Sequence, residues 1–75
     1  MEEKVLSILK KVFDLDAVDI SCSQDNCEKW DSMGQLNLAV ELEDEFGIIL
    51  EPEDIEGIHD VRSIIDTVDR KRRNG

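Results

Sequence analysis

The chain has 75 residues, of which 37% are charged and 40% hydrophobic, and its formal net charge at pH 7 is −10. A chain of this length forms a single domain, predicted to span residues 1–75, and such a domain rarely encloses a deep catalytic cleft. The negative charge excludes nucleic acid and anionic membranes as favoured partners and points instead to proteins with basic patches. We therefore expect a carrier, adaptor or binding module rather than an enzyme.

No segment has the pattern of a signal peptide or the length of a membrane span, so we expect a cytoplasmic protein. Cys22 and Cys27 are too few for a disulfide framework, and they supply only two of the four ligands of a structural zinc site. His59 could provide a third ligand, but the sequence marks no fourth. We predict that no metal is bound and that both cysteines are free thiols in a loop.

The first predicted helix runs from Glu2 to Asp14. Its apolar residues follow the i, i+3, i+4, i+7 spacing of an amphipathic helix. They are Val5, Ile8, Leu9 and Val12. Residues 15–31 lack this period and are rich in Asp, Ser, Asn and Cys, which predicts a long loop. The loop residues expected to point inward are Leu15, Val18 and Ile20.

A second helix is predicted from Ser32 to Phe46. Ser32 and Gln35 fit the S-x-x-Q capping box, and Gly47 supplies a C-terminal stop. Pro52 suits the first position of a short third helix, which is predicted to end near Gly57.

Asp60 can cap a fourth helix. The apolar residues of that helix again follow the amphipathic spacing, at Val61, Ile64, Ile65 and Val68. The basic run Arg70–Arg73 falls where cations complement the negative end of a helix. Because no segment alternates like a strand, we predict an all-α fold: a small four-helix bundle with a long loop between helices 1 and 2.

The second helix carries two apolar faces. At about 100° per residue, one arc suits the bundle core and contains Leu38, Ala39, Leu42 and Phe46. A separate arc, here called the outer strip, contains Met33, Leu36 and Val40. Glu43 and Asp44 flank the outer strip, which favours a docking surface for a basic groove. The alternative is a wide core with apolar residues scattered over the surface.

Ser32 lies at the predicted junction of loop and helix, directly after Asp31. A helix N-terminus presents free N–H groups and a partial positive charge, which would stabilise a phosphodiester on Ser32. Taken alone, however, this serine is better explained as a plain helix cap.

The sequence around Ser32 resembles a known family of carriers. The run Trp30-Asp31-Ser32-Met33 resembles the D-S-L attachment motif of acyl carrier proteins. Residues 42–48 resemble the L-E-x-x-F that closes the family's second helix, and residues 52–55 resemble the start of its short third helix. The similarity covers essentially the whole chain, which is identified as a member of the acyl carrier proteins, of the stand-alone type.

The resemblance implies that a phosphopantetheinyl transferase moves a 4'-phosphopantetheine arm from coenzyme A to Ser32. The thiol of the arm then holds an acyl group as a thioester, and Asp31 assists the transferase. The chain would be a non-catalytic, monomeric carrier for fatty acid biosynthesis or for a specialised pathway to a polysaccharide or secondary metabolite. Its further partners would be acyl-loading and acyl-transferring enzymes with basic docking patches. The residues expected to contact partners are Met33, Leu36, Val40, Glu43 and Asp44.

The chain departs from the family pattern at several positions. Met33 replaces the commoner leucine. Gly34 lies in the first helical turn, where it either lets a partner or the arm approach closely or has no particular role. Ile55 and Ile64 are bulky where fatty-acid-type carriers often have small residues, which disfavours a deep pocket for long acyl chains. The residues predicted to line a small acyl pocket are Leu42, Phe46, Leu50, Ile55 and Ile58.

Two rival functions stay open. An acidic helical adaptor without a prosthetic group would share the charge, the outer strip and the capping serine. A peptidyl carrier is the alternative within the carrier class, although such carriers usually have glycine before the serine and are less acidic.

Overall fold

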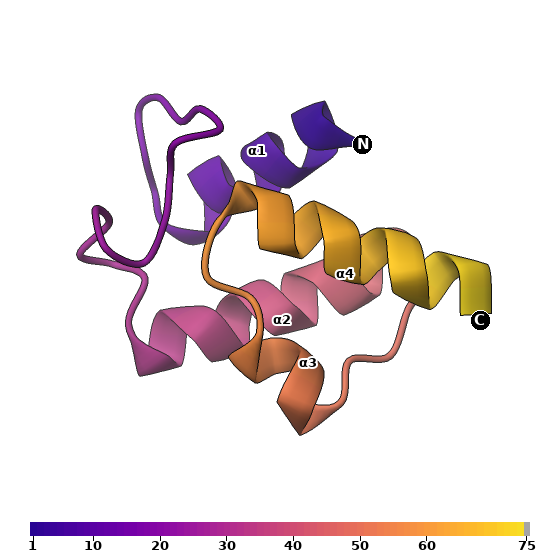
Figure 1. Ribbon diagram of the computed structural model, residues 1–75. Coiled ribbons are helices and arrows are strands. Elements are labelled where there is room, and N and C mark those ends of the chain that lie inside the picture. Colours follow the sequence, from indigo (N-terminus) through magenta and orange to yellow (C-terminus); the bar gives the residue numbers. More distant parts are fainter. Residues whose placement is uncertain (75) are drawn as a thin grey trace.

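The protein forms four helices connected by loops (Figure 1). The computed structural model describes the backbone of residues 1–74 and the side chains of residues 1–73; Gly75, the last residue of the predicted domain, lies outside this part. The helices are α1 (Glu2–Val12), α2 (Ser32–Phe46), α3 (Pro52–Glu56) and α4 (Val61–Asn74). Within residues 1–74 no strand forms, and one isolated bridge pairs Ser23 with Asp60. The all-α bundle predicted from the sequence is confirmed.

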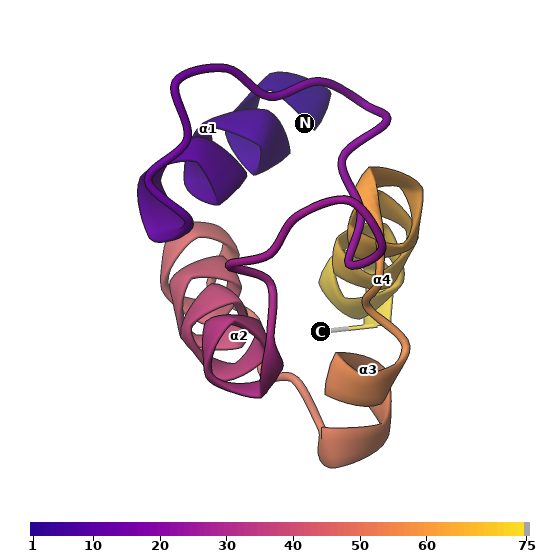
Figure 2. The same cartoon turned by 90° about the vertical axis from the view of Figure 1, so that its left-hand side faces the viewer.

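The long loop covers one end of the bundle. Helix α1 packs against α2 and α4, and α2 also contacts α3 and α4. The loop lies across the end of the bundle where α1 stops and α2 and α4 begin, as the views in Figures 1 and 2 both show. This placement lets the loop lead directly into the first turn of α2. None of the helices in residues 1–74 is long and apolar enough to cross a lipid bilayer.

Helix α1 ends two residues earlier than predicted. Asp14 has a φ of 52°, in the left-handed region, where Asp is tolerated better than most residues. The Phe13 N–H still donates to the carbonyl of Leu9 at 3.0 Å, so the chain turns away from the helix just after this bond. The aromatic ring of Phe13 is thereby directed into the core, where it is 1% exposed.

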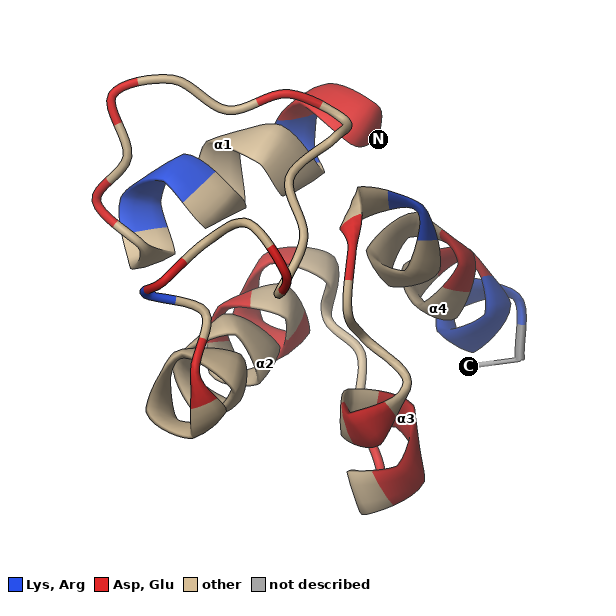
Figure 3. Cartoon of the chain, turned by 60° about the vertical axis from the view of Figure 1, so that its left-hand side comes forward, with Lys and Arg blue, Asp and Glu red and all other residues tan. Residues whose placement is uncertain are grey.

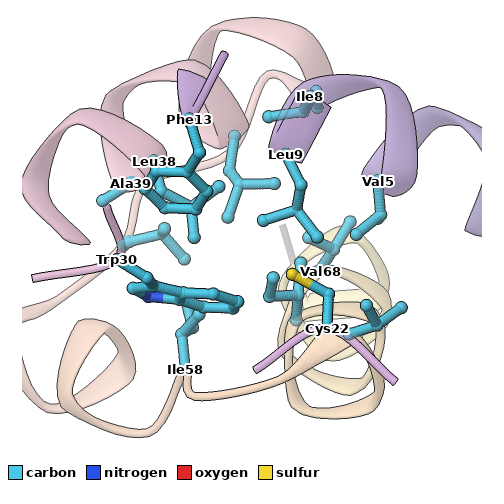
Figure 4. Packing of buried hydrophobic residues seen from close by; sticks show 14 of the residues in the cluster. Val5, Ile8, Leu9, Phe13, Cys22, Trp30, Leu38, Ala39, Ile58 and Val68 are labelled. Carbon is cyan, nitrogen blue, oxygen red and sulfur yellow. The ribbon is translucent and has the colours of Figure 1, made fainter. Parts of the chain in front are cut away.

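The hydrophobic core joins α1, α2, α4 and the long loop (Figure 4). Phe13 stacks on Trp30 with 5.3 Å between ring centroids, which fastens the end of α1 to the end of the loop. The prediction for the loop was partly wrong, because Ile20 is 49% exposed whereas Cys22, Cys27 and Trp30 are buried. Leu15 and Val18 are half-buried against the core, as expected.

The remaining helix boundaries follow the predicted signals. Gly47 ends α2 with a φ of 63°, a conformation that suits glycine. Pro52 is the first residue of α3, which ends directly before Gly57. The Ser63 N–H donates to Asp60 Oδ1 at 2.7 Å, so Asp60 caps α4 as predicted.

Candidate functional site

The cap of α2 is Asp31, one residue before the predicted one. Asp31 has an extended backbone, and its Oδ1 accepts a hydrogen bond from the Gly34 N–H at 2.8 Å. Ser32 is therefore the first residue inside the helix, and the predicted capping box with Gln35 is wrong. Asp and Ser are both strong N-cap residues, so the sequence alone does not fix which of two neighbours caps.

With Asp31 as the cap, the side chain of Ser32 is exposed at the start of α2. The carbonyl of Asp31 accepts from the Gln35 N–H at 2.8 Å, so Asp31 binds two of the first four N–H groups of the helix. Within the described residues, the N–H groups of Ser32 and Met33 have no protein acceptor. A phosphodiester on Ser32 Oγ fits this end, because free N–H groups and the positive end of the helix dipole both stabilise negative charge.

Gln35 connects three parts of the fold. Its Oε1 accepts from the Trp30 indole N–H, and its Nε2 donates to the carbonyls of Ile55 and Ile58, the latter at 2.7 Å. The first turn of α2 is thereby tied to the loop and to the end of α3. Sequence reasoning assigned Gln35 to the cap and missed this role, because two of its three partners are 20 and 23 residues away in the chain.

Gly34 permits the loop to lie directly against α2. A Cβ at this position would be 2.8 Å from Phe13 Cε1 and closer still to the carbonyl oxygen of Lys29. The sequence suggested a close approach at Gly34 by a partner or by the arm. The group that approaches is instead the protein's own loop, which holds residues 29–31 against the first turn.

The outer strip lies on the surface, away from the core. Met33, Leu36 and Val40 are 69%, 54% and 61% exposed. On the opposite face Leu38, Ala39 and Leu42 are buried, and Phe46 is half-buried. These exposures agree with a docking surface and equally with the alternative of scattered apolar residues on the surface of a wide core.

The carboxylates around the outer strip have different surroundings. Asp44 is exposed, whereas Glu43 is half-buried and its Oε2 accepts from the Leu50 N–H at 2.9 Å. Glu41 is held by Lys11 of α1 at 3.2 Å. Figure 3 shows acidic residues along the second half of α2 and on α3, with basic residues mainly on α1 and the last turns of α4. Glu43 thus also fastens the segment that follows α2, a role the sequence did not indicate.

The residues of the predicted acyl pocket lie together in or against the core. Leu42, Leu50 and Ile58 are buried, while Phe46 and Ile55 are half-buried against the same cluster. The bulky Ile64 is also fully buried there. The set is thus contiguous, and its use as an acyl pocket stays a prediction.

An ion-pair cluster fastens α3 to α4. Asp54 is 9% exposed, and its two oxygens contact Arg70 Nη2 at 2.8 Å and Lys71 Nζ at 2.7 Å. The hydrogen bond from Lys71, followed by that from the Glu51 N–H, lowers the pKa of Asp54 below its ordinary value. Part of the basic run predicted to complement the helix dipole thus binds a specific partner.

Comparisons with known proteins agree with this geometry. The family model described as phosphopantetheine attachment site matches residues 3–68. A search of curated proteins finds no match. The chain is 27% identical to a holo acyl carrier protein from Geobacter metallireducens, with a TM-score of 0.84 over 97% of this chain and 86% of that one.

A second solved structure, an acyl carrier protein from Thermotoga maritima, is 28% identical with a TM-score of 0.77, over 96% of this chain and 86% of that one. The prosthetic group of the matched family is covalently attached 4'-phosphopantetheine. Because the family match covers most of the sequence, the chain belongs to the phosphopantetheine attachment family and has the fold of an acyl carrier protein.

Proposed function

We propose that Ser32 bears the 4'-phosphopantetheine arm and that the protein carries acyl groups between partner enzymes. The observation that supports this most strongly is an exposed serine as the first residue of α2, directly after the capping Asp31, in a chain of this family. The serine hydroxyl is free to be modified because Asp31, and not Ser32, accepts the capping hydrogen bond.

The residues around Ser32 have defined tasks in this function. When bound, the arm supplies a terminal thiol that carries the acyl group as a thioester. The N–H groups of Ser32 and Met33 stabilise the negative phosphodiester, and Asp31 keeps the first turn of α2 in place. Gln35 holds the same turn against the loop and α3. The protein contributes presentation and positioning and is proposed to perform no bond chemistry of its own.

The outer strip is the proposed docking surface for partners. Its three apolar side chains start one residue after Ser32, and the exposed Asp44 and the half-buried Glu43 lie beside it. A phosphopantetheinyl transferase and acyl-handling enzymes with basic patches would bury the apolar residues and pair with the carboxylates. We further propose a cytoplasmic monomer that serves fatty acid biosynthesis or a specialised pathway to a polysaccharide or secondary metabolite.

The intact mass of the protein isolated from cells that contain its natural partners tests this function. The proposal expects a mass increase equal to the arm, or to the arm with an acyl group, located on the peptide that contains Ser32. The mass of the acyl group would also assign the pathway. An unmodified chain in such cells would favour the adaptor without a prosthetic group.

A further inference from the structure

Cys22 and Cys27 flank a tight turn in the long loop. The Asn26 N–H donates to the carbonyl of Ser23 at 3.2 Å, which closes a turn of four residues. The Asn26 side chain reinforces this turn, since its Oδ1 accepts from the Ser23 N–H at 3.0 Å and its Nδ2 donates to the Ser21 carbonyl at 2.7 Å. The two cysteines are the residues directly before and after the turn, so the chain reversal brings them together.

Both thiols face the same region of the protein. Cys22 and Cys27 are free, 8% and 9% exposed, and belong to the same hydrophobic cluster. Both also line one open hollow of about 480 Å³ formed by residues of the loop itself, with Leu15 and Val18 on its wall. The hollow is open to solvent, so a small oxidant can reach the pair.

We propose that Cys22 and Cys27 form a reversible intramolecular disulfide when the protein meets hydrogen peroxide. In the first step one thiolate attacks the peroxide, the O–O bond breaks, and a sulfenic acid and hydroxide form. In the second step the other sulfur displaces hydroxide from the sulfenic acid and forms the S–S bond. The two thiol protons leave with the hydroxides as two water molecules, and the two electrons lost by the sulfurs reduce the peroxide.

The surroundings of Cys22 predict how the reaction depends on pH. Burial, followed by the nearby Cys27 thiol, raises the pKa of Cys22. Because the thiolate is the reacting form, oxidation that begins at Cys22 should accelerate as the pH rises above neutrality.

The disulfide would stiffen the segment that leads into α2. The Trp30 N–H donates to the carbonyl of Cys27 at 3.0 Å, and Asp31 directly follows Trp30. A cross-link across the turn restricts the unfolded chain, so the oxidised protein should melt roughly 5 °C higher than the reduced one. This inference does not depend on the arm at Ser32.

The test treats the reduced full-length chain with hydrogen peroxide, blocks remaining thiols with iodoacetamide under denaturing conditions, and measures intact mass. The expected product has lost two hydrogen atoms, takes no alkyl group, contains a Cys22–Cys27 cross-linked peptide, and regains two alkylatable thiols with dithiothreitol. Ser32→Ala should react identically, which excludes a thiol on the arm. Cys22→Ser and Cys27→Ser should each lose the two-hydrogen change.

Three results would overturn the proposal. One is a chain that still takes two alkyl groups after peroxide treatment. Another is a product dominated by sulfinic acid or by disulfide-linked dimers, since neither requires adjacent thiols. The third is a lower melting temperature in the cross-linked protein, because a turn that already places the sulfurs together should not be strained by the bond.

Discussion

Asp31 and Ser32 are neighbours with different tasks. Asp31 accepts the capping hydrogen bond from Gly34, and this leaves the hydroxyl of Ser32 exposed inside the first turn. The sequence located the junction of loop and helix correctly but placed the cap one residue too late. Asp and Ser both accept this bond well, so local preference does not decide which of the two caps the helix. We attribute the choice of Asp31 to the close packing of the loop against Gly34.

Gly34→Ala tests how closely the loop packs on α2. Alanine is intrinsically the better helix former by about 1 kcal/mol, so propensity alone predicts a more stable protein. Because the new Cβ would collide with the Lys29 carbonyl and the Phe13 ring, we expect a net loss of about 1–3 kcal/mol in the free energy of unfolding. Urea denaturation measures this.

Gly57→Ala is the matched control for Gly34→Ala. Gly57 has a φ of −80°, and a Cβ there would be 3.5 Å from its nearest neighbour, an ordinary contact. The free energy of unfolding of the Gly57→Ala protein should differ little from that of the unaltered chain. A Gly34→Ala protein at least as stable as the unaltered chain would show that the loop does not pack as described.

Gln35→Ala removes the links from α2 to Trp30 and to the two carbonyls near the end of α3. Buried groups that lose their partners are costly, so the free energy of unfolding should fall by about 1–3 kcal/mol. Asn37→Ala is the control, since Asn37 is an exposed amide on the same helix. Equal thermal stability of the two variants would contradict the bridging role of Gln35.

At the scale of elements, one face of α2 packs into the core and the opposite face is exposed to solvent. The 3.6-residue period separates these faces in the sequence, so the exposed outer strip could be predicted before the structure was known. The loop could not be predicted to the same extent. It has no period, and its buried residues, Cys22, Cys27 and Trp30, are set by tertiary contacts such as the Phe13–Trp30 stack.

Val40→Glu tests the outer strip as a docking surface. Val40 is 61% exposed, so a glutamate at this position stays in solvent and does not disturb the core. Helicity and melting temperature should therefore be preserved, while the apolar contact with the partner is lost. We expect the KM of a phosphopantetheinyl transferase for this variant to rise by about tenfold, which corresponds to about 1.4 kcal/mol of lost binding.

Ile49→Glu is the matched control for Val40→Glu. Ile49 is 76% exposed but follows the end of α2 and lies outside the outer strip. The transferase should accept this variant like the unaltered chain. Equal KM values for the two variants, or unfolding of Val40→Glu, would remove the support for docking at the outer strip.

Asp54 makes the attachment of α3 to α4 sensitive to acid. Its pKa is lowered in the folded protein, so the unfolded chain binds a proton first as the pH falls. The stability that Asp54 contributes is therefore present above its unfolded pKa of about 4 and is lost as the pH falls toward the lower folded value. Asp54→Asn should lower the free energy of unfolding at pH 7 by about 1–3 kcal/mol.

The pH dependence of the free energy of unfolding distinguishes the contribution of this ion pair from general acid unfolding. Below pH 4 the stability of Asp54→Asn should decline less steeply than that of the unaltered chain, as measured by urea denaturation at several pH values. Asp66→Asn, which removes an exposed carboxylate of α4, should keep the original profile. Parallel profiles for Asp54→Asn and the unaltered chain would contradict the role of this carboxylate.

Over the whole molecule, charge and shape suit a small carrier. Acidic residues gather along the second half of α2 and on α3, while many of the basic residues on α1 and α4 are paired with carboxylates, such as Lys11 with Glu41 and Lys71 with Asp54. The exposed carboxylates of α2 and α3 would suit a partner of opposite charge. Composition predicted the negative net charge, and the fold shows where on the surface the carboxylates gather.

The central claim is that Ser32 is the residue to which the arm is attached. Incubation of the purified chain with coenzyme A and a phosphopantetheinyl transferase, followed by intact-mass measurement, tests it directly. The account predicts one added phosphopantetheine on the unaltered chain and on Ser7→Ala, an exposed serine of α1, and none on Ser32→Ala. Modification that persists in Ser32→Ala, or an unmodified chain under a transferase that loads other carriers, would contradict it.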